Sequence, residues 1–155
     1  MSSRLRVFVP AAGLLIVLCL ASAACDENLS DLTGPTPDLQ PTFSSIQRDI
    51  FDTTDSSGRR ACTQCHTDAG GRRPAGRMNL SQGAAYASLV GVASSAKSGA
   101  IRVIPGDPDN SYLVHKLAGG PGIVGSRMPR IGPPYLTQGQ MLVIRRWIDR
   151  GAPND

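Results

Sequence analysis

The stretch Cys62-Thr63-Gln64-Cys65-His66 brings two thiols and one imidazole together within five consecutive residues. On a helical turn, side chains three positions apart lie on neighbouring positions, so the thiols of Cys62 and Cys65 face the same side. His66 follows directly and lies beside the second thiol. These three side chains are therefore placed to bond one common partner.

The spacing C-x-x-C-H is the pattern of c-type haem attachment. In that chemistry the two thiols form thioethers with the two haem vinyl groups, and the histidine binds the iron from one face. A redox dithiol would expect a strand–helix setting, which the surrounding sequence lacks. A zinc site would need both histidines, His66 and His115, besides the two cysteines, and adjacent ligands chelate awkwardly. The motif predicts one covalent haem c on Cys62 and Cys65 with His66 as proximal iron ligand, while zinc and dithiol stay open as alternatives.

Electron transfer requires a second axial ligand on the iron, for which methionine and histidine are the usual choices. Met128 is the preferred candidate, because glycine and proline keep residues 125–130 out of regular structure, and a loop can lay a thioether over a haem face. Met141 falls in an apolar helical stripe and Met78 precedes a predicted helix, so both are interpreted as packing residues. His115 lies inside a predicted helix and stays open as an alternative ligand, as do Met78 and a water-bound or open iron.

Residues 1–24 have the pattern of a signal peptide. Arg4 and Arg6 form the charged start, an apolar stretch runs from Val7 to Leu20, and the small residues 21–24 follow. An uncleaved membrane anchor is the alternative, although the apolar stretch is short for a membrane span. The chain is therefore expected to be exported.

Cys25 comes directly after the small residues, where bacterial lipoproteins carry the lipidated cysteine, although Ser22 stands where an aliphatic residue is usual. Diacylation would tether the chain to a membrane without a spanning helix. The alternative is cleavage that leaves Cys25 as a reactive free thiol. Residues 25–41, which contain three prolines, are expected to form a flexible tether. The expected location is the periplasmic side or the cell surface, with residues 42–155 as the one folded domain.

The composition favours a domain built around a cofactor. With 5% aromatic residues, 17 glycines and 12 prolines, the chain has few large side chains for a core of its own, and a flat apolar macrocycle would supply buried surface. The formal charge is +4. Cleavage would remove Arg4 and Arg6, and the two haem propionates would bring the balance close to zero. Nucleic-acid binding is not expected, because it would require basic residues clustered on one face.

Four segments have the pattern of short helices. They are residues 42–51; residues 81–90, with Ser81 as N-cap and Gly91 as stop; residues 108–117, with Asp107 as N-cap and Gly119-Gly120 as stop; and a last helix that opens with a capping box between Thr137 and Gln140 and ends after Arg150 at Gly151. An all-α fold is predicted, in which the first and last helices cross. Their contact would consist of Phe43, Ile46, Ile50, Ile144, Trp147 and Ile148. The long loops rich in glycine and proline would pack on the haem.

Three stretches of the chain resemble the class I c-type cytochromes, and in particular the small single-haem cytochrome domains of bacterial lipoproteins and planctomycete-type cytochromes. They are Cys62 to His66; Pro105-Gly106-Asp107-Pro108-Asp109-Asn110-Ser111-Tyr112-Leu113 with Lys116-Leu117; and Met128-Pro129 followed by Leu136, Ile144, Trp147-Ile148 and Gly151-Ala152. Together they cover most of residues 42–155. The resemblance implies a cytochrome c domain of three to five short helices wrapped around one covalently bound haem.

The resemblance also implies His66 as proximal and Met128 as distal iron ligand, with haem as the only cofactor. It implies transfer of single electrons rather than catalysis, so the chain would not be an enzyme, and its partners would be redox proteins that it contacts briefly. The arginines available to pair with the propionates or to steer partners are Arg72, Arg73, Arg127 and Arg130. Their alternative role is that of solvated loop charges.

Two other functions stay open. Without a bond from Met128, an open haem iron would bind small ligands or act as a peroxidatic site, for which His115 is the one candidate acid or base. The other is a zinc-stapled structural module.

Overall fold

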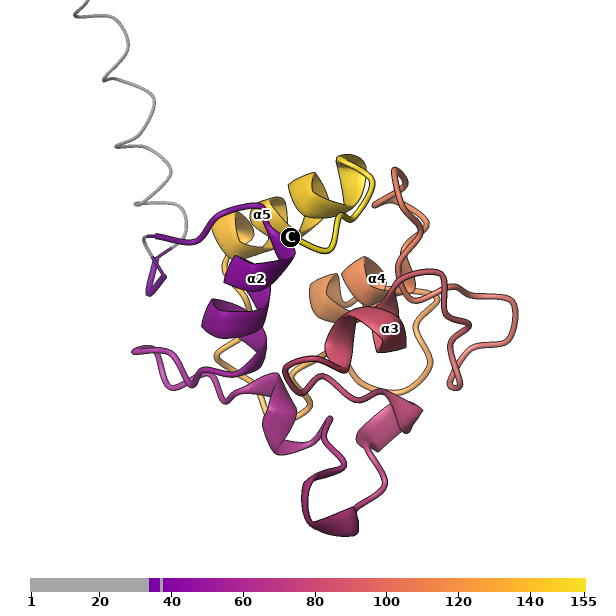
Figure 1. Cartoon of the computed structure of the whole chain (residues 1–155), viewed down its shortest axis with the longest axis horizontal. Coiled ribbons are helices and arrows are strands. Elements are labelled where there is room, and N and C mark those ends of the chain that lie inside the picture. The colour runs from indigo at the N-terminus through magenta and orange to yellow at the C-terminus, as the bar shows by residue number, and fades with distance from the viewer. Residues whose placement is uncertain (1–33, 37) are drawn as a thin grey trace, which may run out of the picture.

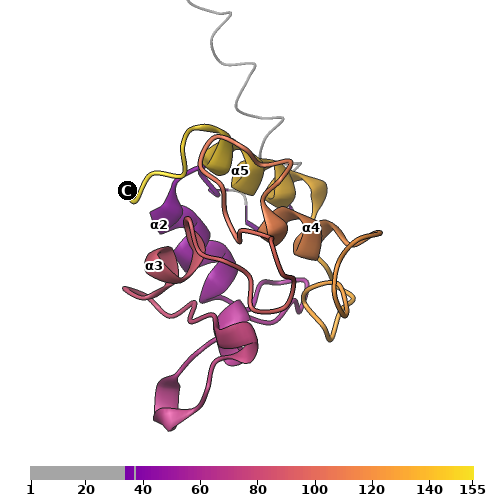
Figure 2. The same ribbon diagram turned by 90° about the vertical axis from the view of Figure 1, so that its right-hand side faces the viewer.

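The computed structural model describes residues 34–36 and 38–155, which fold into short helices joined by long loops (Figure 1). In chain order, the elements are the α-helix α2 (Phe43–Ile46), the π-helix η3 (Gln47–Phe51), the 3-10 turns η4 (Cys62–Gln64), η5 (Ala69–Gly71) and η6 (Ala75–Arg77), and the α-helices α3 (Ala85–Leu89), α4 (Tyr112–Ala118) and α5 (Gln138–Asp149). Helix α5 lies at one end of the molecule and the turns η4 to η6 lie towards the other (Figures 1 and 2). Helices α3 and α4 lie between them.

The expected helical class is confirmed for the described residues. They form helices and no strand, and their only extended pairings are the isolated bridges Val90–Val103 and Ala93–Ile101. Within residues 34–36 and 38–155, no helix has the length and hydropathy to cross a membrane. The haem inside this helical fold stays a prediction.

The first predicted helix forms as α2 and η3. The Thr42 hydroxyl caps it by accepting a backbone N–H of the first turn at 3.2 Å. The apolar side chains of Phe43, Ile46 and Ile50 are buried, as their spacing predicted. The second half widens into a π-helix that also buries Phe51, and such turns are rare and often lie near functional sites.

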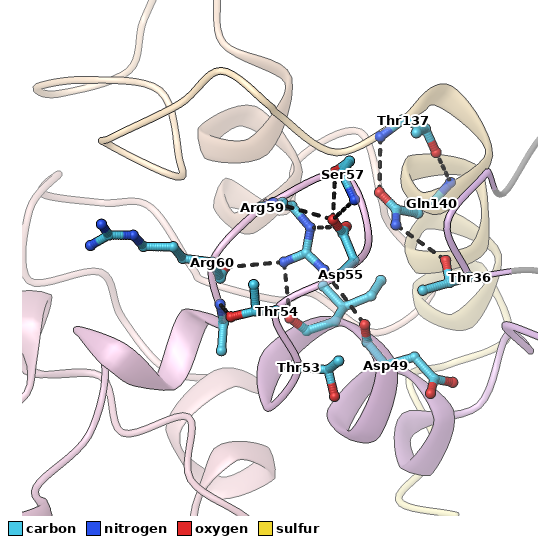
Figure 3. Close-up of polar contacts among 12 residues, drawn as sticks. Thr36, Asp49, Thr53, Thr54, Asp55, Ser57, Arg59, Arg60, Thr137 and Gln140 are labelled. Atoms are coloured by element: carbon cyan, nitrogen blue, oxygen red, sulfur yellow. Dashed lines mark hydrogen bonds and ion pairs between the residues drawn. The ribbon is translucent and has the colours of Figure 1, made fainter.

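The last helix, α5, opens with the predicted capping box. The Thr137 hydroxyl accepts the Gln140 amide at 3.1 Å, and the Gln140 side chain accepts the Thr137 amide at 3.0 Å (Figure 3). The helix ends as predicted before Gly151, whose φ of +94° favours glycine. Its most deeply buried residues are Gln140, Val143, Ile144, Trp147 and Ile148.

The predicted contact between the first and last helices is present. The rings of Phe43 and Trp147 pack with centroids 5.4 Å apart. Phe43 also makes edge-on contacts with Phe51 at 6.4 Å and Tyr86 at 5.3 Å. The Phe43 amide donates to the side chain of Asp155 at 2.6 Å, which ties the end of the chain to the same place. Phe43, Phe51, Tyr86 and Trp147 thus form one aromatic cluster.

Helix α3 begins later than predicted, at Ala85 rather than near Ser81. The Ser81 hydroxyl bonds the Thr67 hydroxyl at 2.9 Å instead of capping a helix. Residues 82–84 form turns that precede the helix. The predicted N-cap at Ser81 is therefore wrong, because a contact distant in sequence takes its side chain.

Helix α4 also begins later, at Tyr112 rather than near residue 108, and Ser111 rather than Asp107 is its N-cap residue. The Asp107 carboxylate accepts the Asn110 amide at 3.1 Å and closes a turn before the helix. Asp followed by Pro suits the start of a turn as well as the start of a helix, so the local pattern was ambiguous. The predicted stop is right, since Gly119 ends the helix with a φ of +77°.

The packed part of the chain begins before the predicted start of the domain. Leu39 is 1% exposed and belongs to the core, and the Thr36 hydroxyl accepts the Gln140 side-chain amide at 3.1 Å. The last residues of the predicted tether thus pack on the domain rather than remaining extended. The predicted signal peptide, residues 1–24, and the predicted lipidation site Cys25 lie outside the described residues.

Removing the cap of α5 should weaken the domain. Thr137→Ala deletes the hydroxyl that accepts the Gln140 amide, and the loss of such an N-cap costs about 1 kcal/mol. We expect the free energy of unfolding, measured by chemical denaturation, to fall by that amount. Thr137→Ser keeps the hydroxyl and is the matched control, so an equal loss in both variants would contradict the capping role.

Candidate functional site

A cavity of about 690 Å³ lies beside the Cys62–His66 motif. Its walls come from the end of η3, the turns η4 and η6, helix α4 and the loop 124–131, and they are mostly apolar. Cavities of about 300–1,000 Å³ with apolar walls and a few polar groups are typical of ligand and cofactor sites. Both cysteines and the histidine of the motif line this cavity, and so does Met128. The structure thus brings together the four side chains that the sequence singled out for cofactor binding.

The motif is held against the C-terminal end of η3. The Cys62 thiol donates to the Ile50 carbonyl at 3.6 Å, and the Thr63 hydroxyl donates to the Phe51 carbonyl at 3.2 Å. Carbonyls at a helix end lack partners within the helix, so the motif serves as the cap of η3. Cys62 and Cys65 are both free thiols.

Burial raises the pKa of the Cys62 thiol to about 11, an effect that the nearby Arg59 guanidinium only partly offsets. The thiol is therefore protonated at neutral pH. Redox-active cysteines instead have a lowered pKa, and the thiolate is also the form that binds zinc. The surroundings of Cys62 are thus unsuited to disulfide exchange.

His66 is oriented by a backbone oxygen. Its Nδ1 lies 2.8 Å from the Ala75 carbonyl oxygen. Since a carbonyl oxygen can only accept, Nδ1 carries the ring proton and Nε2 keeps its lone pair. Burial lowers the pKa of His66 and so favours the neutral ring. A neutral imidazole whose second nitrogen bonds a carbonyl is the usual arrangement of a histidine that binds a metal.

Met128 lies on a loop that hydrogen bonds tie to helix α4. Its amide donates to the Lys116 carbonyl at 2.8 Å. The Lys116 ammonium in turn donates to the carbonyls of Val124 and Ser126, at 2.9 Å and 2.5 Å. The Val124 amide donates to the Tyr112 hydroxyl at 2.8 Å. These bonds hold Met128 at the cavity wall although its loop has no regular structure.

The structure separates the residues that the sequence offered as a second axial ligand by their position relative to the cavity. Of the three other candidates, Met78 lines the cavity, whereas His115 and Met141 do not. His115 is exposed, and its Nε2 lies 2.7 Å from the Asp109 carbonyl oxygen. Met141 is partly buried against the core. Only Met128 and Met78 among these four are therefore placed to reach a group in the cavity.

Arg59, which the sequence analysis missed, also lies in the cavity wall. It is 1% exposed, and its Nε forms an ion pair with the Asp55 carboxylate at 2.9 Å. Its Nη1 donates to the Ile50 carbonyl at 3.1 Å and its Nη2 to the Asp49 carbonyl at 3.5 Å (Figure 3). Burial alone would raise the pKa of Asp55, but the Ser57 hydrogen bond and the Arg59 charge lower it below its usual value. The only signal in the sequence was a pair of opposite charges four residues apart, in a segment without periodicity.

Among the described residues, those that line the cavity include several cations and no carboxylate. The cations are Arg59, Arg60, Arg102, Lys116 and Arg130. Of the four arginines predicted to meet propionates or partners, Arg130 is in the wall. Arg72 and Arg73 are exposed elsewhere, and Arg127 packs over the Tyr135 ring at 4.0 Å. Such a charge distribution suits a ligand with anionic groups.

Within the part of the chain that the structure describes, no three His, Cys, Asp or Glu side chains are grouped so that they could hold a metal ion. A zinc site made from the motif and His115 would require such a group. The zinc alternative therefore finds no ligand set there.

Comparison of the chain with models of protein families, with curated proteins and with solved structures finds no match. The function is therefore inferred from the residues of the site.

Neutralising Asp55 should destabilise the protein strongly. Asp55→Asn leaves the buried Arg59 guanidinium without its carboxylate, and breaking a buried ion pair costs about 3–5 kcal/mol. We expect the free energy of unfolding in urea to fall by that order. Asp68→Asn removes the same charge from an exposed position and is the control. A loss of equal size in both variants would contradict the role of the buried pair.

The same ion pair should make stability depend on acid pH. Because the pKa of Asp55 is lowered in the folded protein, its contribution is complete above the ordinary value of about 3.9 and is lost as the pH falls through the lowered value. The difference in unfolding free energy between the wild type and Asp55→Asn should therefore narrow below about pH 4. Urea titrations of both proteins at neutral and acid pH measure this difference, and a constant gap would count against it.

Proposed function

We propose that this chain is an exported c-type cytochrome with one haem, which carries single electrons. The observation that carries the proposal is the cavity of about 690 Å³ whose wall combines the two motif thiols, His66 and Met128. Cys62 and Cys65 would bond the two vinyl groups, and His66 and Met128 would be the axial ligands. A haem held in this way supplies one-electron chemistry at its iron. The chain would then be a carrier rather than an enzyme.

Three features of the site fit a haem. The volume and the apolar walls suit a flat apolar macrocycle. The cations of the wall, without a carboxylate among the described lining residues, suit two propionates. Burial lowers the pKa of His66 and favours its neutral form, and its hydrogen bond to Ala75 leaves Nε2 as the nitrogen able to bind iron.

The surroundings of the ligands would set the redox behaviour. The wall includes the buried leucines Leu80, Leu113, Leu117 and Leu136, which would limit the access of water to a bound group on their side. Limited access of water disfavours the ferric charge, and a thioether from Met128 favours the ferrous state. The Ala75 carbonyl raises the basicity of the His66 ring by accepting its Nδ1 proton, which favours the ferric state and offsets only part of these two effects. We therefore expect a relatively high reduction potential.

The proposal includes a membrane anchor outside the cytoplasm. Residues 1–24 would be removed as a signal peptide and Cys25 would carry the lipid. The segment after Cys25 would link the lipid to the folded part, on the periplasmic side or at the cell surface. Redox proteins would dock briefly, and no nucleic acid would be bound. Export agrees with the motif, since haem is attached to c-type cytochromes outside the cytoplasm.

The alternatives fit the site less well. A redox dithiol needs a lowered thiol pKa, whereas that of Cys62 is raised. A zinc module needs a ligand group that the described residues do not form. An open haem iron differs from the proposal only in whether Met128 binds, which the spectrum decides.

Expression in a bacterial host that matures c-type cytochromes tests the proposal. We expect a coloured protein whose mass exceeds that of the polypeptide by one haem, with the spectrum of a low-spin c-type iron. Cys62→Ala and Cys65→Ala should each leave a single thioether, while Thr63→Ala should keep both. A colourless protein without a porphyrin adduct would falsify the proposal. Acyl chains on the fragment that starts at Cys25 would be seen in the same mass analysis.

Replacing Met128 should change the absorption spectrum and the midpoint potential of the haem iron. Met128→Ala would abolish the weak absorption band of sulfur–iron ligation and lower the midpoint potential by at least about 59 mV, a tenfold change for a one-electron couple. Met141→Ala, a core methionine outside the cavity wall, is the matched control and should keep both properties. If Met78→Ala or His115→Ala removes the band and Met128→Ala does not, the assignment of Met128 is wrong.

A further inference from the structure

Arg102 is a buried arginine in the cavity wall that has no carboxylate partner among the described residues. The residue lines the cavity and is 7% exposed. None of the ion pairs formed in the described part of the chain includes it. A buried charge is costly unless an opposite charge or a full set of hydrogen bonds compensates it. The position of Arg102 therefore calls for an anion.

The other cations of the wall do not share this property. Arg59 is buried, but Asp55 neutralises it at 2.9 Å. Arg60 and Arg130 are exposed to solvent. Lys116 is only half-buried, and its ammonium donates to two carbonyls of the neighbouring loop. Among the described lining residues, Arg102 alone combines burial with the lack of a counter-charge.

The hydrogen bonds of Arg102 leave part of its guanidinium unused. Nη1 donates to the Ser88 carbonyl at 2.6 Å, and Nη2 donates to the carbonyls of Gly76 and Arg77 at 3.0 Å and 3.2 Å. A guanidinium has five N–H donors, so at least two remain for a further acceptor. Burial also lowers the pKa of Arg102, which agrees with incomplete compensation of its charge. Neutral carbonyls hold the side chain in place without cancelling its charge.

Arg102 acts on the same turn that orients His66. Gly76 and Arg77, whose carbonyls it binds, follow Ala75 in η6, and Ala75 accepts the Nδ1 proton of His66. The guanidinium is therefore fixed to the part of the cavity wall that bears the histidine. Its charge lies close enough to influence an iron bound by that histidine.

We propose that Arg102 is the counter-ion of a carboxylate on the group bound in the cavity, which is a haem propionate if the function proposed above holds. The free N–H donors bond the carboxylate, and the ion pair is shielded from water by the buried position of Arg102. This assignment rests on the proposed function but names a residue to which neither the motif nor the composition pointed.

Two effects on the redox behaviour follow. A fixed positive charge near the iron disfavours the ferric state and so raises the midpoint potential. The same charge keeps the paired carboxylate ionised at lower pH, because a neighbouring cation lowers the pKa of a carboxyl group. The other ionisable groups at the cavity are the four remaining cations, His66, Cys62, Cys65 and the Tyr112 phenol, and no protein carboxylate among the described lining residues competes for Arg102. The midpoint potential of the wild type should therefore change little between about pH 5 and pH 8, the range in which an unpaired propionate would titrate.

Redox titration of the haem-loaded protein and three variants tests the assignment. Arg102→Gln removes the charge, Arg102→Lys keeps the charge without the planar fork, and Arg77→Gln removes an exposed charge from the same turn as a control. For Arg102→Gln we expect a midpoint potential lower by about 59 mV, which is a tenfold shift for one electron, and a new pH dependence between about pH 5 and pH 8. Arg102→Lys should show a smaller fall, and Arg77→Gln should match the wild type.

Several outcomes would overturn the assignment. One is an Arg102→Gln protein with the potential and pH profile of the wild type. Another is an equal fall in both Arg102 variants without pH dependence, which would mean that Arg102 only holds the turn. If Arg102→Gln fails to accumulate, the Arg102→Lys protein provides the test. A single ammonium holds a carboxylate less firmly, so the midpoint potential of this variant should begin to depend on pH at the acid end of the range. A pH dependence identical to that of the wild type would refute the pairing. A wild type that carries no haem overturns the proposed function as well, whereas a haem-loaded wild type that fails these tests overturns only the role of Arg102.

Discussion

The carbonyl oxygen of Ile50, at the end of the π-helix η3, joins the core of this protein to its cavity. It accepts hydrogen bonds from Arg59 Nη1 at 3.1 Å and from the Cys62 thiol at 3.6 Å. The side chain of the same residue, Ile50, is fully buried in the core. Carbonyls at a helix end need partners from outside the helix, and here those partners belong to the cavity wall. The position of the motif thus depends on the packing of the first helix.

Long cationic side chains hold the loops of this protein together. Loops rich in glycine and proline leave backbone carbonyls without regular partners, and buried carbonyls need donors. Lys97 donates to Gly122 at 2.7 Å, and Arg127 donates to Leu117 at 2.7 Å. Arg59, Arg102 and Lys116 bind backbone carbonyls in the same way. These five cations of the described residues therefore have a structural role, because they provide donors for loop carbonyls.

This use of cations also gives the cavity its chemical character. The wall is mostly apolar, and its described lining residues include five cations and no carboxylate. Of these cations, Arg59 is neutralised by Asp55, which does not line the cavity. His66 and Met128 reach the wall from segments far apart in the chain, and each is fixed by a backbone hydrogen bond, to Ala75 for one and to Lys116 for the other. Under the proposed function, ligands held in this way before binding would need little rearrangement when the iron changes its charge.

The sequence by itself determined the features that depend on near neighbours. The C-x-x-C-H motif, the capping box at Thr137, the apolar spacing of the first helix and the glycine that ends α4 are all defined within a few residues, so local chemistry was enough to predict them. The tertiary structure alone decided the rest. The Ser81 hydroxyl bonds Thr67 instead of capping a helix, and Leu39, which was assigned to the tether, packs in the core. His115 and Met141 stayed outside the cavity while Arg59 and Arg102 entered its wall. These outcomes depend on contacts between segments that are distant in the chain and come together only on folding. Hydrophobic periodicity and capping residues report on near neighbours, so they could not predict these contacts.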